Sequence, residues 1–148
     1  MAEEQMVVFK LGDEEYAVPI SEVREIIRYS GVTKIPNAPR YMEGILNLRG
    51  SVLPVINLAS RFNQTSVWGE ETKVIIIESG AHYLGIIVDE VTEVLSIPAG
   101  QIEAPPSIIT HNAAIRGIGK LEGRLLILLN LQELFSQEEL EDFQEVIP

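Results

Sequence analysis

The sequence predicts an all-β protein built from two small barrels of about five strands each. One observation is local: short runs rich in β-branched and aromatic residues, such as residues 7–11 and 74–78, are bounded by turn residues. The other is an internal duplication, in which two copies share one order of apolar runs and turns. Five short strands can close into a barrel, and closure removes exposed strand edges. We therefore expect a single domain over residues 1–148 that contains two barrels.

The duplication relates about residues 6–62 to about residues 74–135. The last parts of the two copies align without a gap, and eight of nineteen positions there are identical. Equivalent residues are 68 positions apart at the start of the copies and 73 positions apart at the end. The additional residues must lie between Leu95 and Gly117, in a segment rich in Pro, Gly and Ala that suits an insertion.

Tight hairpin turns are expected at Arg49-Gly50 in the first copy and at Glu122-Gly123 in the second, because x-Gly between two apolar runs is typical of such turns. Equivalent positions at this corner carry opposite charges. We interpret the difference as a means for the two halves to select different partners. Pro54 follows the first turn. Since proline lacks a backbone N–H, its strand should lie at a sheet edge or have its N–H side free.

Short helices are expected after Asn57 and Asn130, because an asparagine side-chain oxygen can cap a helix N-terminus. A longer helix is expected at the C-terminus, over residues 136–148, where Ser136 opens the capping-box sequence SQEE. The apolar side chains of this helix fall on one face: Leu140, Phe143 and Ile147.

The composition excludes several classes of function. The net charge is −11, and a phosphate backbone favours Lys and Arg, so we expect no nucleic-acid partner. Residues 1–73 carry 8 basic and 10 acidic side chains, and residues 74–148 carry 3 basic and 12 acidic ones. Two unlike halves suit two partners, although a solvated acidic surface is the simpler interpretation. The absence of cysteine excludes disulfides and thiolate metal sites.

Membrane insertion is not expected either. The N-terminal sequence lacks a signal-peptide pattern. The longest apolar run has about five residues, whereas a membrane span needs roughly 20. We expect a cytoplasmic protein.

No catalytic or metal site is recognisable in the sequence. His82 and His111 have no neighbour at ligand spacing and are interpreted as exposed loop residues. Two carboxylate pairs recur at equivalent places in the copies: Glu22/Glu25 and Glu90/Glu93. Their repetition indicates a structural corner rather than acid–base catalysis. Phosphate-binding glycine loops and nucleophile motifs are absent. We expect a protein without enzymatic activity, cofactor or metal.

Four segments, taken in order, resemble the CheW-like domain family of chemotaxis coupling proteins: GDEEYAVPISEVREI, GILNLRGSVLPVINL, YLGIIVDEV and GKLEGRLLILLNL. The resemblance covers roughly residues 5–136. It implies two intertwined five-stranded SH3-like β-barrels with a shared core and no catalysis. It also implies an adaptor that joins the cytoplasmic tip of chemoreceptors (methyl-accepting chemotaxis proteins) to the regulatory domain of the histidine kinase CheA. Such an adaptor is expected to be monomeric alone and to form rings with the kinase in membrane-associated receptor arrays.

The resemblance also implies candidate site residues. Those expected to face the receptor are Val23, Glu25, Arg49 and Val91. Those expected to face the kinase are Glu43, Val52, Pro54, Glu103 and Ile108. From the residues alone, Arg49 could be an ordinary solvated turn arginine, and Val23 and Val91 could be core residues.

Other functions are weighed against the adaptor. One is the equivalent adaptor of a pilus-type or other non-flagellar chemosensory array. Another is a double β-barrel that binds a small ligand or an oligosaccharide, which would need aromatic side chains on one face, where Trp68 is the single tryptophan. A third is an acid–base enzyme that uses Glu22 and Glu25.

Overall fold

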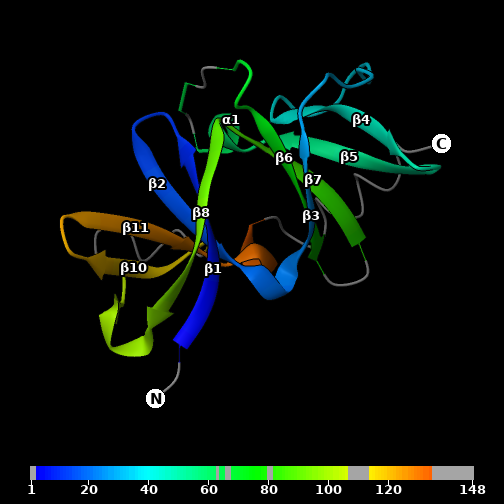
Figure 1. The fold of residues 1–148 in the computed structure, drawn as a ribbon. Helices are drawn as coiled ribbons and strands as arrows, with labels where there is room; N and C mark the ends of the chain where they lie inside the picture. The colour runs from blue at the N-terminus through cyan, green and yellow to red at the C-terminus, as the bar shows by residue number, and fades with distance from the viewer. Residues whose placement is uncertain (1–2, 63, 66–67, 80–81, 107–113, 135–148) are drawn as a thin grey trace.

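The computed structural model describes residues 3–62, 64–65, 68–79, 82–106 and 114–134, and strands dominate it (Figure 1). The strands are β1 (Glu3–Leu11), β2 (Glu14–Pro19), β3 (Val23–Arg28), β4 (Met42–Leu48), β5 (Ser51–Asn57), β6 (Lys73–Ser79), β7 (His82–Val88), β8 (Glu90–Pro98), β9 (Ile102–Glu103), β10 (Ile115–Leu121) and β11 (Arg124–Leu129). The short helices are η1 (Ile20–Glu22), α1 (Leu58–Arg61), η2 (Ala99–Gln101) and η4 (Leu131–Glu133). The predicted all-β fold class is confirmed.

The strands form two sheets, and each sheet combines strands from both copies of the repeat. The six-stranded sheet has the order β8-β1-β2-β11-β10-β9, so β1 and β2 of the first copy lie among strands of the second. The five-stranded sheet has the order β3-β6-β7-β5-β4, so β6 and β7 of the second copy lie among strands of the first. The two copies are therefore intertwined, as the resemblance implied. The extra strand beyond five per sheet is the two-residue β9.

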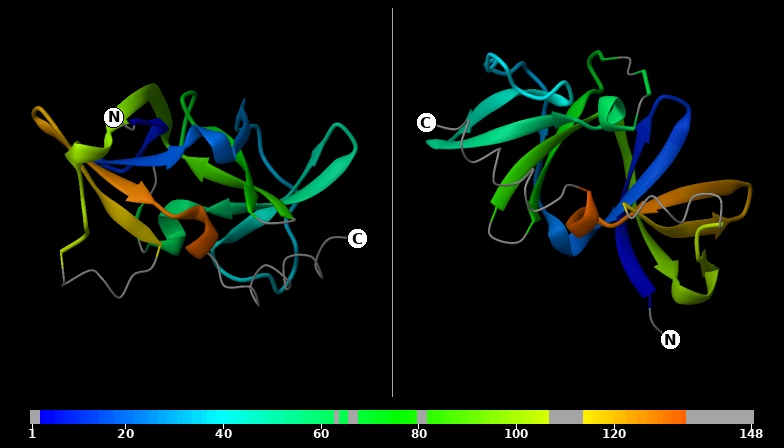
Figure 2. Two further views of the ribbon diagram at one scale, coloured as in Figure 1. Left: turned by 90° about the horizontal axis from the view of Figure 1, so that it is seen from below. Right: turned by 180° about the vertical axis from the view of Figure 1, so that it is seen from behind.

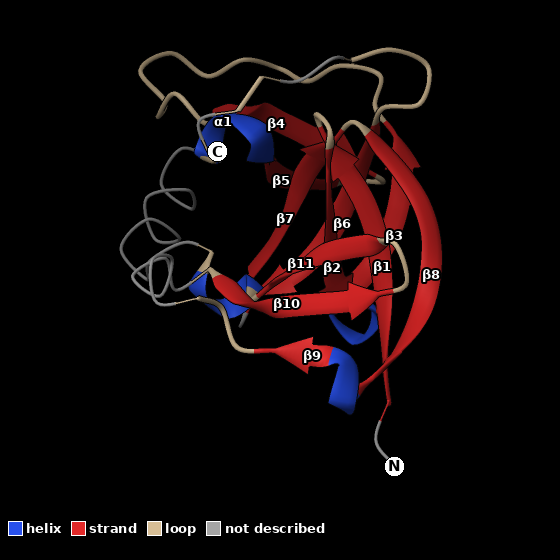
Figure 3. Cartoon of the chain, turned by 90° about the vertical axis from the view of Figure 1, so that its left-hand side faces the viewer, coloured by secondary structure: helices blue, strands red, loops and turns tan. Residues whose placement is uncertain are grey.

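Both sheets curl so that their outermost strands come together. In the six-stranded sheet the outermost strands, β8 and β9, are joined by the short turn η2 (Figure 3). In the five-stranded sheet the chain that leaves β3 returns at Thr33, which pairs with Ile45 of the opposite edge strand β4. Thr33 and Ile45 exchange two backbone hydrogen bonds, of 2.9 and 2.8 Å. These contacts cover strand edges that would otherwise be exposed.

Two glycines at equivalent positions of the repeat leave room for the segments that close the sheets, which are the chain around Thr33 and strand β9. A Cβ atom at Gly44 would collide with the backbone carbonyl oxygen of Thr33, and one at Gly117 would lie 2.8 Å from that of Glu103. The identity of Gly44 and Gly117 in the repeat therefore has a steric reason, because any larger residue would push the closing segment away from the sheet.

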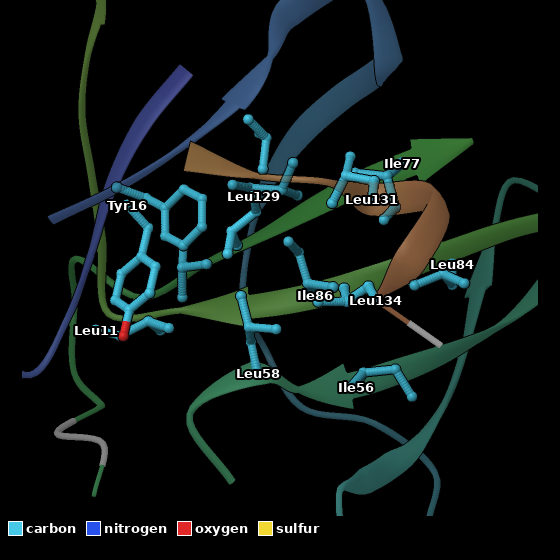
Figure 4. Close-up of a cluster of buried hydrophobic side chains, with 14 of the residues drawn as sticks. Leu11, Tyr16, Ile56, Leu58, Ile77, Leu84, Ile86, Leu129, Leu131 and Leu134 are labelled. Atoms are coloured by element: carbon cyan, nitrogen blue, oxygen red, sulfur yellow. The ribbon is translucent and has the colours of Figure 1, made fainter. Parts of the chain in front are cut away.

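The largest apolar cluster lies between the two sheets and draws on both (Figure 4). Leu11, Tyr16 and Leu129 enter it from the six-stranded sheet, and Ile56 and Ile86 enter it from the five-stranded sheet. Two smaller clusters fill the two sheets separately. The shared core that the resemblance implied is therefore present, and it lies against the faces that the two sheets turn toward each other.

Both predicted hairpin turns are present, but their backbone geometry differs. In the β4–β5 turn both central residues have positive φ, 51° at Arg49 and 91° at Gly50, as in a type I′ turn. In the β10–β11 turn Gly123 has a φ of 72° while Glu122 does not have positive φ, as in a type II turn. Asn47 Oδ1 accepts a hydrogen bond of 2.9 Å from the Gly50 N–H, which helps to hold the first turn.

The asparagine caps are partly confirmed. Asn57 Oδ1 accepts a hydrogen bond of 3.1 Å from the Ser60 N–H and caps α1, while η4 follows Asn130. The expected helix over residues 136–148 lies outside the described residues. Within the residues that are described, no helix is both long and apolar enough to cross a bilayer.

Two alternatives were expected for Pro54, an edge strand or a free N–H side, and the structure does not have the first. β5 lies between β7 and β4 and is interior. Pro54 stands opposite Ile45, whose own N–H and C=O point away from β5 toward Thr33. Two opposite residues of an antiparallel pair direct their backbone N–H and C=O groups either both toward each other's strand or both away from it. Since Ile45 points away from β5, the nitrogen of Pro54 points away from β4. On that side, pairing with β7 begins at Val55.

Candidate functional site

The structure brings together two of the residues expected to face the receptor. Arg49, at the tip of the β4–β5 hairpin, forms an ion pair with Glu25 of β3, and its second guanidinium nitrogen lies 3.4 Å from the other carboxylate oxygen. The hydrogen bonds that Arg49 donates to Glu25 raise the pKa of Arg49. The Arg49 side chain is 70% exposed, so the pair is well solvated and contributes little to stability. Its effect is to orient the hairpin tip against β3.

The second barrel contains the counterpart of this pair. Arg124, at the start of β11, lies 2.7 Å from Glu15 of β2 and 2.8 Å from Glu93 of β8. Glu93 is the repeat equivalent of Glu25. Each copy therefore pairs the same glutamate with an arginine of its own hairpin. The second copy carries that arginine two residues beyond the corner position, so Glu122 can occupy the corner. This supports the interpretation of the repeated carboxylates as structural corners.

The ion pairs of Arg124 with Glu15 and Glu93 should make the stability of the fold depend on pH. The hydrogen bond from Arg124 lowers the pKa of Glu15 below its ordinary 4.5, and burial opposes this shift in part. A carboxylate whose pKa is lower in the folded than in the unfolded state stabilises the fold at pH values above its unfolded-state pKa. This stabilisation is lost as the pH falls through its folded-state pKa. We expect Arg124→Gln to lower the free energy of unfolding at pH 7 by about 1 kcal/mol.

The same variant should show a shallower loss of stability than wild type on acidification from about pH 5 to about pH 3. Urea unfolding at each pH measures both effects. Arg49→Gln, which removes the exposed pair of the other barrel, is the control and should change the acid slope less. Identical slopes in wild type and Arg124→Gln would contradict the assignment.

The two valines expected to face the receptor are only partly exposed. Val23 begins β3 and Val91 lies near the start of β8, at equivalent positions of the repeat, and both pack against the main core. Core packing, the alternative interpretation, is therefore observed for both valines. Their assignment to a receptor surface stays a prediction.

The residues expected to face the kinase are spread over both barrels. Glu43 and Val52 lie on the β4–β5 hairpin, where Val52 is exposed, but Pro54 is buried and does not present a contact surface. Glu103 lies in β9, on the other barrel, and Glu43 and Glu103 pair with lysines at 3.4 and 3.3 Å. Ile108 lies outside the described residues. The described members of this set therefore form two separate surfaces.

In the described part of the chain, no group of three or more His, Asp or Glu side chains is placed to bind a metal ion. His82, expected in a turn, is instead the first residue of β7, and His111 lies outside the described residues. Trp68 borders a hollow of about 390 Å³ whose other lining is largely acidic, and its ring packs edge-on against Tyr29. This lining lacks the aromatic face that a sugar-binding barrel needs.

A family model described as a CheW-like domain matches residues 5–139. The chain belongs to the CheW-like domain family. It is 40% identical to the chemotaxis protein CheW of Klebsiella aerogenes over 140 residues, which cover 93% of this chain and 84% of that protein. It is 38% identical to CheW of Treponema pallidum, with 93% and 85% covered. The crystal structure of the scaffolding protein TtCheW from Thermoanaerobacter tengcongensis matches with a TM-score of 0.85 at 36% identity, covering 94% of this chain and 92% of that one.

Within this CheW-like domain, sequence reasoning missed three exposed apolar side chains. Large apolar residues are exposed at equivalent positions of both copies: Ile26 (38%) with Val94 (53%), and Val52 (37%) with Leu125 (63%). Only Val52 was among the expected site residues. Their equivalent exposure in both halves makes these positions candidates for binding surfaces.

A signal for Ile26 was present in the sequence. Exposure alternates along β3, so that Ile26 shares the exposed side with Arg24 and Arg28. An apolar residue flanked at both i ± 2 positions by arginine indicates a solvent-facing apolar group in any strand. Val94 has the same place in the second copy, and the repeat alignment alone would have paired the two.

Proposed function

We propose that this CheW-like protein is an adaptor that couples chemoreceptors to the histidine kinase CheA, by docking and without catalysis. The observation that carries the proposal is the pair of repeat-equivalent exposed apolar positions, Ile26/Val94 and Val52/Leu125, each near an arginine–glutamate pair. Its relatives support the role, since they are named chemotaxis protein CheW and one solved relative is named a scaffolding protein.

The receptor would dock on a seam patch, which we define as Ile26 and Val94. Ile26 pairs with Ile75 of β6, and Val94 pairs with Val7 of β1, and both of these partners belong to the main core. Paired residues share a sheet face, so Ile26 and Val94 lie at the solvent margin of that core. β3 and β8 lie on the same side of the molecule (Figures 1 and 3). Apolar side chains of the receptor tip would cover this margin.

Arg49 supplies the polar edge of the same surface, because Glu25 precedes Ile26 and orients the guanidinium toward β3. Arginine combines an apolar stem with five hydrogen-bond donors, which explains its frequency among interface anchors. An acidic group of the receptor could bind the free edge of this guanidinium.

The kinase would dock at the ends of the molecule. The β4–β5 and β10–β11 hairpins project toward opposite ends (Figure 2), with Val52 exposed on one and Leu125 on the other. Their tips carry opposite charges, Arg49 and Glu122. Two unlike ends would let each adaptor contact two kinase barrels and so extend a ring. We propose that the protein acts in the cytoplasm, that it is monomeric alone, and that it is recruited to receptor arrays at the membrane by avidity.

The proposal is tested by calorimetric titration of the protein with a receptor signalling-tip fragment and, separately, with the regulatory domain of CheA. We expect wild type to bind both, and Arg49→Glu to lose at least tenfold in affinity for the receptor because it loses the donors and repels Glu25. Glu122→Arg, at the equivalent corner of the other hairpin, is the matched control and should retain receptor binding. Absence of binding to both partners at about 100 μM would overturn the adaptor function.

A further inference from the structure

At Asn47 the outer edge of β4 has no backbone partner among the described residues. Leu48 and Ser51 flank the two-residue turn and form its closing hydrogen-bonded pair, so the next pair, Asn47 and Val52, does not hydrogen-bond. The backbone N–H and C=O of Asn47 therefore point away from β5, as those of Ile45 do. The backbone of Thr33 hydrogen-bonds to both the N–H and the C=O of Ile45, but no described residue hydrogen-bonds to the backbone N–H or C=O of Asn47.

The open position faces a hollow rather than a covered strand. An open surface depression of about 300 Å³ lies between residues 30–33 and residues 45–47. Gly31, two residues before Thr33, would continue the ladder opposite Asn47, but its φ of 105° turns the chain away. In the other barrel the closing strand extends one residue further, because β9 pairs with both Ile118 and Gly119, the repeat equivalents of Ile45 and Leu46.

We infer that this hollow binds the side-chain carboxamide of an asparagine or glutamine presented by the receptor tip, an assignment that rests on the proposed function. A carboxamide offers an N–H donor and a C=O acceptor side by side, so it can pair with both groups of Asn47 as the backbone of Thr33 pairs with Ile45. Val32 and Leu46 line the hollow and would contact the methylene groups of the side chain.

An extended peptide strand fits this edge less well than a side chain. The outward-pointing neighbours of Asn47 along the strand are Ile45, which Thr33 already occupies, and Arg49, which lies in the turn. One residue with one donor and one acceptor is therefore available, and strand addition needs a longer run of free backbone. Arg49 follows two residues later, so the carboxamide and the guanidinium contact would belong to one partner surface.

The direct test is amide hydrogen exchange of the wild-type protein by NMR, free and saturated with the receptor signalling-tip fragment. The Asn47 amide should exchange rapidly in the free protein and at least tenfold more slowly in the complex. Unchanged exchange at Asn47 in a complex that forms normally would overturn the inference, while leaving the proposed function intact. Absence of any complex would instead overturn the proposed function.

A variant pair separates the backbone donor from the side chain. Asn47→Pro removes the N–H, and Asn47→Ala keeps it, while both remove the hydrogen bond to Gly50. We expect Asn47→Pro to bind the receptor fragment about tenfold more weakly than Asn47→Ala. Equal affinities of the two folded variants would contradict the inference, and should Asn47→Pro not fold, the exchange measurement on wild type still decides.

Substitution on the fragment distinguishes a carboxamide from a peptide backbone. Each asparagine and glutamine of the fragment is changed singly to alanine. One such change should abolish the slowed exchange at Asn47. Retention of slow exchange in every one of these complexes would assign the hollow to a strand of the partner and overturn the carboxamide.

Discussion

Gly44→Ala is expected to destabilise the protein by about 3 kcal/mol. The added Cβ would meet the carbonyl oxygen of Thr33 and the side chain of Val32. Backbone cannot move aside as a flexible side chain can. Relief therefore requires breaking the two hydrogen bonds between Thr33 and Ile45 that close the five-stranded sheet.

Urea unfolding followed by circular dichroism measures the effect. Gly117→Ala, the equivalent change in the other barrel, should also destabilise, because its Cβ would lie 2.8 Å from the carbonyl oxygen of Glu103. Gly100→Ala is the matched control: its Cβ would meet nothing within 4 Å and its φ is not positive, so stability should change by less than about 0.5 kcal/mol. A Gly44→Ala protein as stable as Gly100→Ala would show that the closing segment does not constrain the barrel.

Ile26→Asp combined with Val94→Asp should abolish receptor binding and leave kinase binding near that of wild type. Each side chain is an exposed apolar anchor of the seam patch, and loss of such an anchor costs about 2 kcal/mol or more of binding free energy, roughly 30-fold in affinity. The stability cost should be small, because both side chains are already exposed in the free protein. Calorimetry with the two partners measures both binding reactions.

Leu125→Asp is the control for this experiment, since it adds the same charge at the most exposed of these apolar residues but on the β10–β11 hairpin. It should retain receptor binding and weaken binding of the kinase domain. If Leu125→Asp lost receptor binding as fully as the double variant, added negative charge would explain both results and the seam patch would not be the receptor surface.

Much of the local structure was predictable, because local chemistry determines it. The Arg49-Gly50 turn needs positive φ that glycine tolerates, and the cap of α1 needs a polar side chain such as Asn57 three residues before the N–H that it accepts. The repeat made these predictions stronger, since the same local patterns occur twice. The candidate site was less predictable: Arg49 and Glu25 were named through the resemblance, but their ion pair joins residues 24 positions apart.

The sequence by itself determined that this is an all-β protein with two related halves, tight glycine turns and opposite charges at equivalent corners. The alternation of apolar and polar residues and the residue types of tight turns act within a few positions of the chain. They can therefore be recognised in a single sequence. Only the tertiary structure decided that β1 and β2 pair with strands of the second copy and β6 and β7 with strands of the first. The same long-range pairing leaves Val94 and Leu125 exposed and gives Glu93 its arginine. Exposure and pairing depend on which distant strands lie alongside a residue, and a sequence pattern does not specify those neighbours.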